Sequence, residues 1–108
     1  MSIKRVWHWW TTKENADKYQ NILSKEVLPG IEAKNISGYQ KIEVLRTEHE
    51  HEVEFVTIMR FDSLDAVREF AGAAYQEAVV PEKARAVLSR FDRQSQHYEV
   101  RAERTAEG

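Results

Sequence analysis

The sequence predicts an α+β domain of the ferredoxin-like class, with the element order β-α-β-β-α-(α)-β and a four-stranded antiparallel sheet. Short segments rich in β-branched and aromatic residues alternate with segments in which apolar residues recur at helical spacing. The chain has 108 residues, 42% of them hydrophobic and 31% charged, which is typical of one globular domain. We place this domain at residues 1–100 and a polar tail at 101–108.

The first predicted unit is a strand followed by a helix. Residues 3–10, IKRVWHWW, carry the β-branched and aromatic side chains that strands favour. Thr11 and Glu14 fit a capping box, in which the threonine caps the helix that follows. We expect this helix to end at the pair Pro29-Gly30, because both residues disfavour its continuation. Its apolar positions recur at helical spacing: Ala16, Tyr19, Ile22, Leu23 and Val27.

A β-hairpin is predicted next. Residues 38–46, GYQKIEVLR, and 53–61, VEFVTIMRF, have strand composition, and the polar turn TEHEHE at 47–52 separates them. Two strands joined by so short a turn are expected to pair as antiparallel neighbours.

The last third of the chain is predicted to add two helices and a closing strand. Residues 62–72 form a short helix, with Gly72 at its C-terminal end. Residues 81–91, PEKARAVLSRF, form a second helix, since proline is favoured at the first helical position. Residues 95–100, SQHYEV, read as the strand that completes the sheet.

Both faces of this sheet carry large apolar residues. In the first strand Trp7 and Trp9 point to one side, whereas Val6 and Trp10 point to the other. The strand at 53–61 is likewise apolar on both sides. The fold has helices on one face only, so the second face requires a partner, most simply a second copy of the chain. The sequence therefore predicts a homodimer.

Composition disfavours several classes of partner. The formal charge of −2 gives no electrostatic basis for binding nucleic acid or an anionic membrane. The chain has no cysteine, which excludes disulfides and thiolate metal sites. The sequence also shows no apolar run long enough for a signal peptide or a membrane span, so we expect a cytoplasmic protein.

Four stretches resemble the antibiotic-biosynthesis-monooxygenase-like family of dimeric α+β barrels. They are RVWHWWTTKENADKY, LPGI with ISGYQKIEVLR, VEFVTIMRFDSLDAVREFAGAAYQEAVVP and the terminal HYEV. The resemblance implies a dimeric barrel with one pocket per protomer, between the sheet and its helices. It does not fix the activity, because the family includes cofactor-free oxygenases that convert phenols to quinones as well as heme-degrading enzymes.

Heme degradation is disfavoured by the residues at the positions that match the heme-degrading members. Those members use an Asn on the first strand and a Trp and a His on the helix after the hairpin. The corresponding residues here are Trp7, Phe70 and Val80, and none matches. We therefore expect no heme, metal or flavin cofactor.

The resemblance places Arg5, Trp7 and Trp9 at the pocket and Val6, His8 and Trp10 at the dimer interface. We expect Arg5 to hold an anionic oxygen of a small aromatic or polyketide-like substrate, with Trp7 and Trp9 stacked on its ring. His97 or Tyr75 would handle the proton, because histidine ordinarily titrates near neutrality. Phe70 completes the predicted substrate-binding set.

Each of these residues also has an ordinary structural interpretation. Trp7 and Trp9 can be core residues, and His97 a partly exposed residue at a strand end. Arg5 can instead form an ion pair with Glu43 or Glu99. If these interpretations hold, the protein is a non-catalytic dimeric barrel that binds a small ligand.

Two further segments are candidates for function. HEHE at 49–52 has the residue types of a metal site, but it falls on a polar hairpin turn, so we expect no native metal there. YQEAVVP at 75–81 connects two helices and is a candidate lid over the pocket. The alternative is that Ala78, Val79 and Val80 fill the core.

Overall fold

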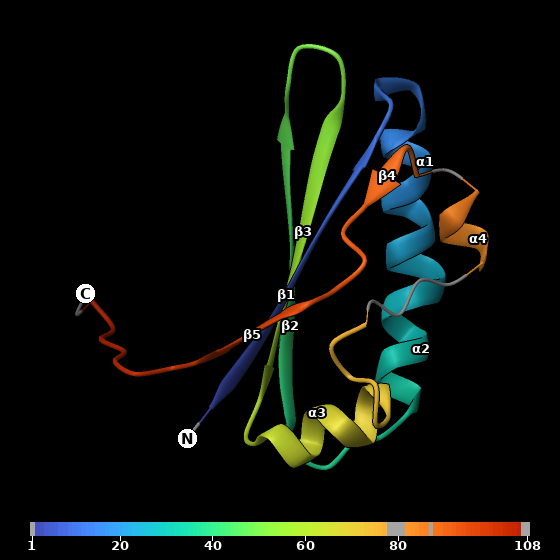
Figure 1. Ribbon diagram of the computed structural model, residues 1–108. Helices are drawn as coiled ribbons and strands as arrows, with labels where there is room; N and C mark the ends of the chain where they lie inside the picture. Colours follow the sequence, from blue (N-terminus) through green and yellow to red (C-terminus); the bar gives the residue numbers. More distant parts are fainter. Residues whose placement is uncertain (1, 78–81, 87, 107–108) are drawn as a thin grey trace.

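A computed structural model describes residues 2–77, 82–86 and 88–106 of the chain (Figure 1). It shows one antiparallel sheet with all its helices on the same side, which confirms the predicted α+β fold class (Figure 1). The elements in order are β1 (Ile3–Thr11), α1 (Lys13–Ile22), the π-helical turn η1 (Leu23–Val27), α2 (Leu28–Ala33), β2 (Tyr39–Glu48), β3 (Val53–Phe61), α3 (Leu64–Ala71), α4 (Glu82–Arg85), β4 (Arg90–Phe91) and β5 (Gln96–Glu99).

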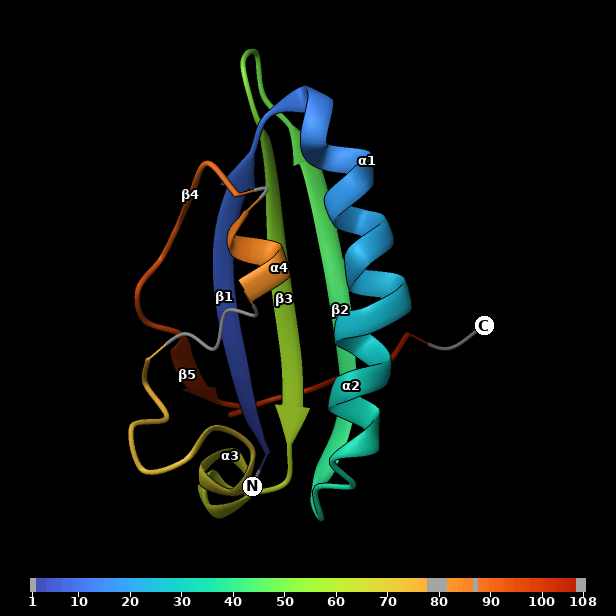
Figure 2. The same cartoon turned by 90° about the vertical axis from the view of Figure 1, so that its right-hand side faces the viewer.

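The described residues form five strands rather than the predicted four. The order is β2-β3-β1, and β4 and β5 then pair with β1, one near each end (Figure 2). The predicted helix at 81–91 is therefore wrong in its second half: α4 ends at Arg85, and Arg90–Phe91 is a strand. Pairing with β1 explains the difference, because the backbone N–H of Ser89 donates to the carbonyl oxygen of Trp10 at 2.8 Å. Pro81, the predicted helix start, lies outside the described residues.

The first helix does not stop at Pro29-Gly30, contrary to the prediction. It runs on through η1 into α2, which places Pro29 in the first turn of α2. In η1 the N–H of Leu28 donates to the carbonyl of Leu23, five residues back. Proline has no backbone N–H, so in a regular α-helix Pro29 would leave one i→i−4 hydrogen bond unmade. The wider π-helical turn just before Pro29 changes the hydrogen-bond pattern at this point, so the helix continues.

The predicted cap of this helix is shifted by one residue. Thr12, not Thr11, is the N-cap, and its side-chain oxygen accepts from the N–H of Asn15 at 3.1 Å. Thr11 is fully buried as the last residue of β1, opposite Val53. The strand is longer than its aromatic run because β3 supplies a pairing partner for Thr11.

The core lies between the sheet and the helices. In β1 and β3 the odd-numbered residues face the helices, and most of them are buried. Trp9 and Phe55 are cross-strand neighbours whose rings stack with centroids 5.9 Å apart, and Tyr19 of α1 meets both edge-on. Aromatic pairs of this kind add about 0.5–1.5 kcal/mol each beyond the area they bury.

The other face of the sheet has no helix over it among the described residues (Figure 1). Its central positions are apolar and only partly buried, and Leu45 and Tyr98 are 44% and 57% exposed. We call this surface the open face; its residues include Val6, Trp10, Leu45, Val56, Ile58 and Tyr98.

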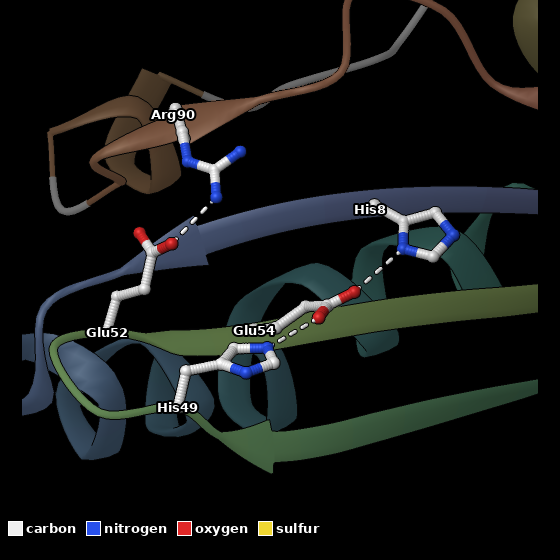
Figure 3. Close-up of polar contacts among 5 residues, drawn as sticks. All are labelled: His8, His49, Glu52, Glu54 and Arg90. Atoms are coloured by element: carbon white, nitrogen blue, oxygen red, sulfur yellow. Dashed lines mark hydrogen bonds and ion pairs between the residues drawn. The ribbon is translucent and has the colours of Figure 1, made fainter.

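A cluster of charged groups lies at the hairpin end of the open face (Figure 3). Glu54 contacts His8 Nδ1 at 3.0 Å and His49 Nε2 at 2.8 Å. These two hydrogen bonds, the one from His49 first, lower the pKa of Glu54. Beside them Arg90 pairs with Glu52 at 2.7 Å (Figure 3). The residues of HEHE are thus engaged in polar contacts at the hairpin, since His51 Nε2 also lies 3.6 Å from Glu50 Oε1.

Among the described residues, no group of three or more His, Cys, Asp or Glu side chains is placed so that it could hold a metal ion. No helix in this part of the chain is long and apolar enough to cross a membrane.

Candidate functional site

An apolar cavity lies between the sheet and the long helix. It measures about 60 Å³, room for only a few water molecules. The sheet contributes Arg5, Trp7, Trp9, Ile42, Thr57 and Met59 to its wall. The helical side contributes Tyr19, Leu23, Val27, Leu28, Ile31 and Phe70, and Ser95 also lines the cavity. The π-helical turn is part of this wall, and such turns are frequent at functional sites.

The two tryptophans of the cavity differ in their hydrogen bonding. Their ring centroids are 4.6 Å apart. Trp7 donates its indole N–H to the carbonyl oxygen of Asp92. Trp9 is 1% exposed, and its indole N–H has no hydrogen-bond partner among the described residues. Trp9 therefore keeps a buried donor without an acceptor in the part of the chain that the structure describes.

Arg5 is a buried cation without a counter-ion among the described residues. Arg5 is only 4% exposed, and burial lowers the pKa of its guanidinium to about 10. Its Nη1 donates to the carbonyl oxygen of Tyr75 and lies 3.0 Å from His97 Nε2, and its Nη2 donates to the carbonyl of Glu77 at 3.1 Å. All three are neutral acceptors. No described carboxylate pairs with Arg5, so the ion pair with Glu43 or Glu99 considered from the sequence is not formed.

His97 lies directly opposite Arg5, because β5 pairs with β1 in that register. Its pKa is lowered to about 4, first by burial and then by the positive charge of Arg5. The sequence-based expectation that His97 titrates near neutrality is therefore wrong. The guanidinium of Arg5 can only donate hydrogen bonds, so Nε2 of His97 must be the acceptor in this contact. The neutral imidazole therefore carries its proton on Nδ1.

Tyr75, in the segment after α3, adjoins both Arg5 and His97. Its ring meets the imidazole edge-on with centroids 5.1 Å apart, and the Arg68 guanidinium lies 5.4 Å from the Tyr75 centroid. Tyr75 and His97 line a second, more polar cavity of about 380 Å³. Ser95 lines both cavities.

The six predicted site residues thus form two adjacent groups. Arg5, Trp7, Trp9 and Phe70 line the apolar cavity, whereas His97 and Tyr75 line the polar one. The hydrogen bonds of Arg5 join the groups. Phe70 also lies near Arg5, with 5.7 Å between the guanidinium carbon and the ring centroid.

Sequence reasoning missed the residues that complete the walls. Met59 and Thr57 could have been found, because strand alternation puts them on the same side as Phe55. Ser95 and the carbonyl of Glu77 had no sequence signal. Of the predicted lid at 75–81, residues 78–81 lie outside the described residues. They include Val80, on which the argument against heme partly rests.

Of the comparisons with known proteins, the one with solved structures bears on the fold. No protein-family model matches the chain, and no curated protein matches its sequence. A candidate antibiotic biosynthesis monooxygenase from Bacillus cereus superimposes with a TM-score of 0.67 at 14% identity, over 97% of this chain and 98% of that one. Rv0793 from Mycobacterium tuberculosis gives 0.62 at 14% identity, over 97% and 100%.

A third solved structure adds a described activity. SnoaB, a cofactor-independent oxygenase from Streptomyces nogalater, gives a TM-score of 0.56 at 18% identity, over 96% of this chain and 95% of that one. These likenesses span nearly the whole chain, and they confirm the predicted resemblance at the level of the fold. The chain has the fold of antibiotic-biosynthesis-monooxygenase-like proteins.

Proposed function

We propose that the protein is a homodimeric oxygenase that acts on a small hydroxylated aromatic molecule without metal or flavin. The observation that carries this proposal is Arg5, a buried cation with three neutral acceptors and no described carboxylate partner. Burying an unpaired charge costs several kcal/mol, and an anionic oxygen of a ligand would offset that cost.

The surroundings of Arg5 suit an aromatic ligand. Trp7 and Trp9 present ring surface to the same cavity. The indole N–H of Trp9, which has no partner in the described part of the chain, could donate to a second ligand oxygen. A ring does not fit a cavity of about 60 Å³, so the wall must move when it binds. The π-helical turn Leu23–Val27 is the part of the wall that departs from regular helix geometry.

The proposed reaction needs only the substrate and molecular oxygen. A phenol and O₂ give a quinone and water: one oxygen atom joins the ring carbon, and the other leaves as water with the hydrogens of the O–H and C–H bonds. The substrate supplies the electrons. Arg5 would stabilise the phenolate that reacts with O₂, and His97 or Tyr75 would handle its proton. The structural likeness to SnoaB supports this type of chemistry.

The test combines binding with oxygen consumption. The probe is 2-naphthalenesulfonate, a planar anion that should quench tryptophan fluorescence on binding. Arg5→Met should weaken that binding by about 1.5–3 kcal/mol, roughly 10- to 150-fold, the scale of a hydrogen bond to a charged group. The control is Arg104→Met, at an exposed position of the tail. Quenching that is the same in both variants contradicts the role of Arg5.

Oxygen consumption with hydroxylated naphthalenes and anthrones then tests the reaction. We expect uptake of O₂ with appearance of quinone absorbance, and loss of both in Arg5→Met. A second candidate, a non-catalytic ligand-binding dimer, is favoured by the low pKa of His97, about 4, because so weak a base is mostly unable to take a proton at pH 7. Probe binding without O₂ uptake on any of these compounds would select it.

A further inference from the structure

We infer that Arg5 and His97 act as a coupled pair, so that the site binds an anion and a proton together. In the free protein Arg5 occupies the acceptor nitrogen of His97. When an anion takes over that donor, His97 becomes free to bind a proton. The inference rests on the proposed function in one respect, that an anion binds at Arg5.

The pairing follows from counting donors. Nη1 of Arg5 carries two hydrogens, and the structure gives both an acceptor: the carbonyl oxygen of Tyr75 and Nε2 of His97. The lone pair of Nε2 is therefore engaged, and the imidazole faces a cation at 3.0 Å. Both features oppose a second proton on His97.

The other charged and titratable groups around His97 do not compensate Arg5. From β5, Glu99 lines the same polar cavity, but its carboxylate pairs with Arg101 at 3.1 Å. From the segment after α3, the Tyr75 ring contacts the imidazole at an interplanar angle of 80°, and Arg68 of α3 lies over the Tyr75 ring. Among the described residues, Arg5 is therefore the charge in direct contact with the imidazole.

An anion at Arg5 reverses both effects. Its oxygen competes for the Nη1 hydrogen and so releases Nε2, and its negative charge offsets the guanidinium. The pKa of His97 in the free protein, about 4, has the charge of Arg5 as its second cause after burial. Removing that second cause, and adding an anion nearby, must raise it.

This coupling identifies a class of substrate. An anion and a proton bound together are equivalent to a neutral weak acid, such as a phenol or an enol. On binding, the O–H bond breaks, its electron pair stays on the oxygen held by Arg5, and its proton moves to Nε2 of His97. In the free protein His97 is unprotonated and its Nε2 is engaged by Arg5. Binding of the substrate releases Nε2, so that His97 can accept the proton of the substrate.

The experiment uses 2-naphthalenesulfonate, which stays charged at every pH tested, so any proton taken up belongs to the protein. Calorimetric titrations in two buffers of different ionisation enthalpy count the protons bound with the probe. We expect proton uptake at pH 5 and an affinity at least about threefold higher at pH 5 than at pH 7.5. Circular dichroism confirms that the protein is folded at both values.

Two variants and one spectrum sharpen the test. His97→Gln keeps an acceptor for Arg5 but has no titration, so its affinity should not rise as the pH falls. His51→Gln, whose side chain is 88% exposed on the hairpin, should behave as the wild type. The NMR chemical shifts of the imidazole nitrogens should show that His97 carries its proton on Nδ1 in the free protein. With the probe bound at pH 5, they should show that His97 is an imidazolium.

The outcomes separate the two proposals. Probe binding that depends on Arg5 but brings no proton uptake overturns the coupling and leaves the proposed function standing. The same pH dependence in His97→Gln as in the wild type also overturns it. Failure of the probe to bind at any pH contradicts both.

Discussion

Acid should destabilise the wild-type protein more than the His97→Gln variant. The ordinary pKa of histidine is 6.5, and in the folded protein that of His97 is about 4. Between these values the unfolded chain binds a proton that the folded protein does not bind. The free energy of unfolding therefore falls as the pH drops below 6.5, and the loss is complete near pH 4.

The size of this loss follows from the two pKa values. A difference of about 2.5 units corresponds to about 3.4 kcal/mol at 1.36 kcal/mol per unit. The imidazole is only partly buried, so solvent screening reduces the effect, and we expect about 2 kcal/mol between pH 7 and pH 4.5. Burial is the larger cause and Arg5 the second, so the effect should shrink but persist when Arg5 is replaced.

Urea unfolding at fixed protein concentration, followed by tryptophan fluorescence at pH 7, 6, 5 and 4.5, measures this difference. The quantity of interest is the free energy of unfolding of the wild type minus that of His97→Gln at each pH. It should fall by about 2 kcal/mol across the range, whereas the same difference for His51→Gln should stay within about 0.5 kcal/mol. A difference for His97→Gln that is constant with pH refutes the assignment of a depressed pKa.

Three other predictions concern the scaffold. Light scattering should give twice the mass of one chain, and a monomeric wild type contradicts the dimer. Ile58→Asp on the open face should give monomers, because it places an unpaired charge in the expected interface. Gly38→Ala should lower stability by about 1 kcal/mol or more in melts, since φ is +89° and the new Cβ would lie 2.3 Å from Asp62 Oδ1. Gly30→Ala should not lower stability, because nothing lies within 4 Å of a Cβ added at that position. Phe55→Ala should cost about 3–5 kcal/mol in urea unfolding, and under 1 kcal/mol would contradict its place in the core.

Local patterns predicted the strands well because the side-chain period of a strand is short. The third predicted strand has the bounds found in the structure, Val53–Phe61, and alternation assigned its faces. Gly72 ends α3 with φ +86°, a conformation that glycine adopts without strain. These features depend on residues close together in the chain.

The errors have a common physical cause, which is the influence of distant partners on local preference. The two-residue strand β4 exists because the edge of β1 needs a partner, and two residues have no detectable period. The helix passes Pro29 because a π-helical turn precedes it. The acceptors of Arg5 at Tyr75 and Glu77 lie 70 and 72 residues away in the sequence, so no local pattern could reveal them.

The register between β1 and β5 determines the chemistry of the site. It sets Arg5 opposite His97 and Lys4 opposite Tyr98, so the arginine and the imidazole share the helix-facing side. A slip of one residue would move His97 to the open face and leave Arg5 beside a glutamine or a tyrosine. The same alternation divides the tryptophans: Trp7 and Trp9 line the cavity, whereas Trp10 lies on the open face with the Arg90 guanidinium 3.8 Å above its ring. One strand therefore builds both the ligand cavity and the surface expected to bind a second copy, so substitutions at odd and even positions of β1 should affect ligand binding and assembly separately.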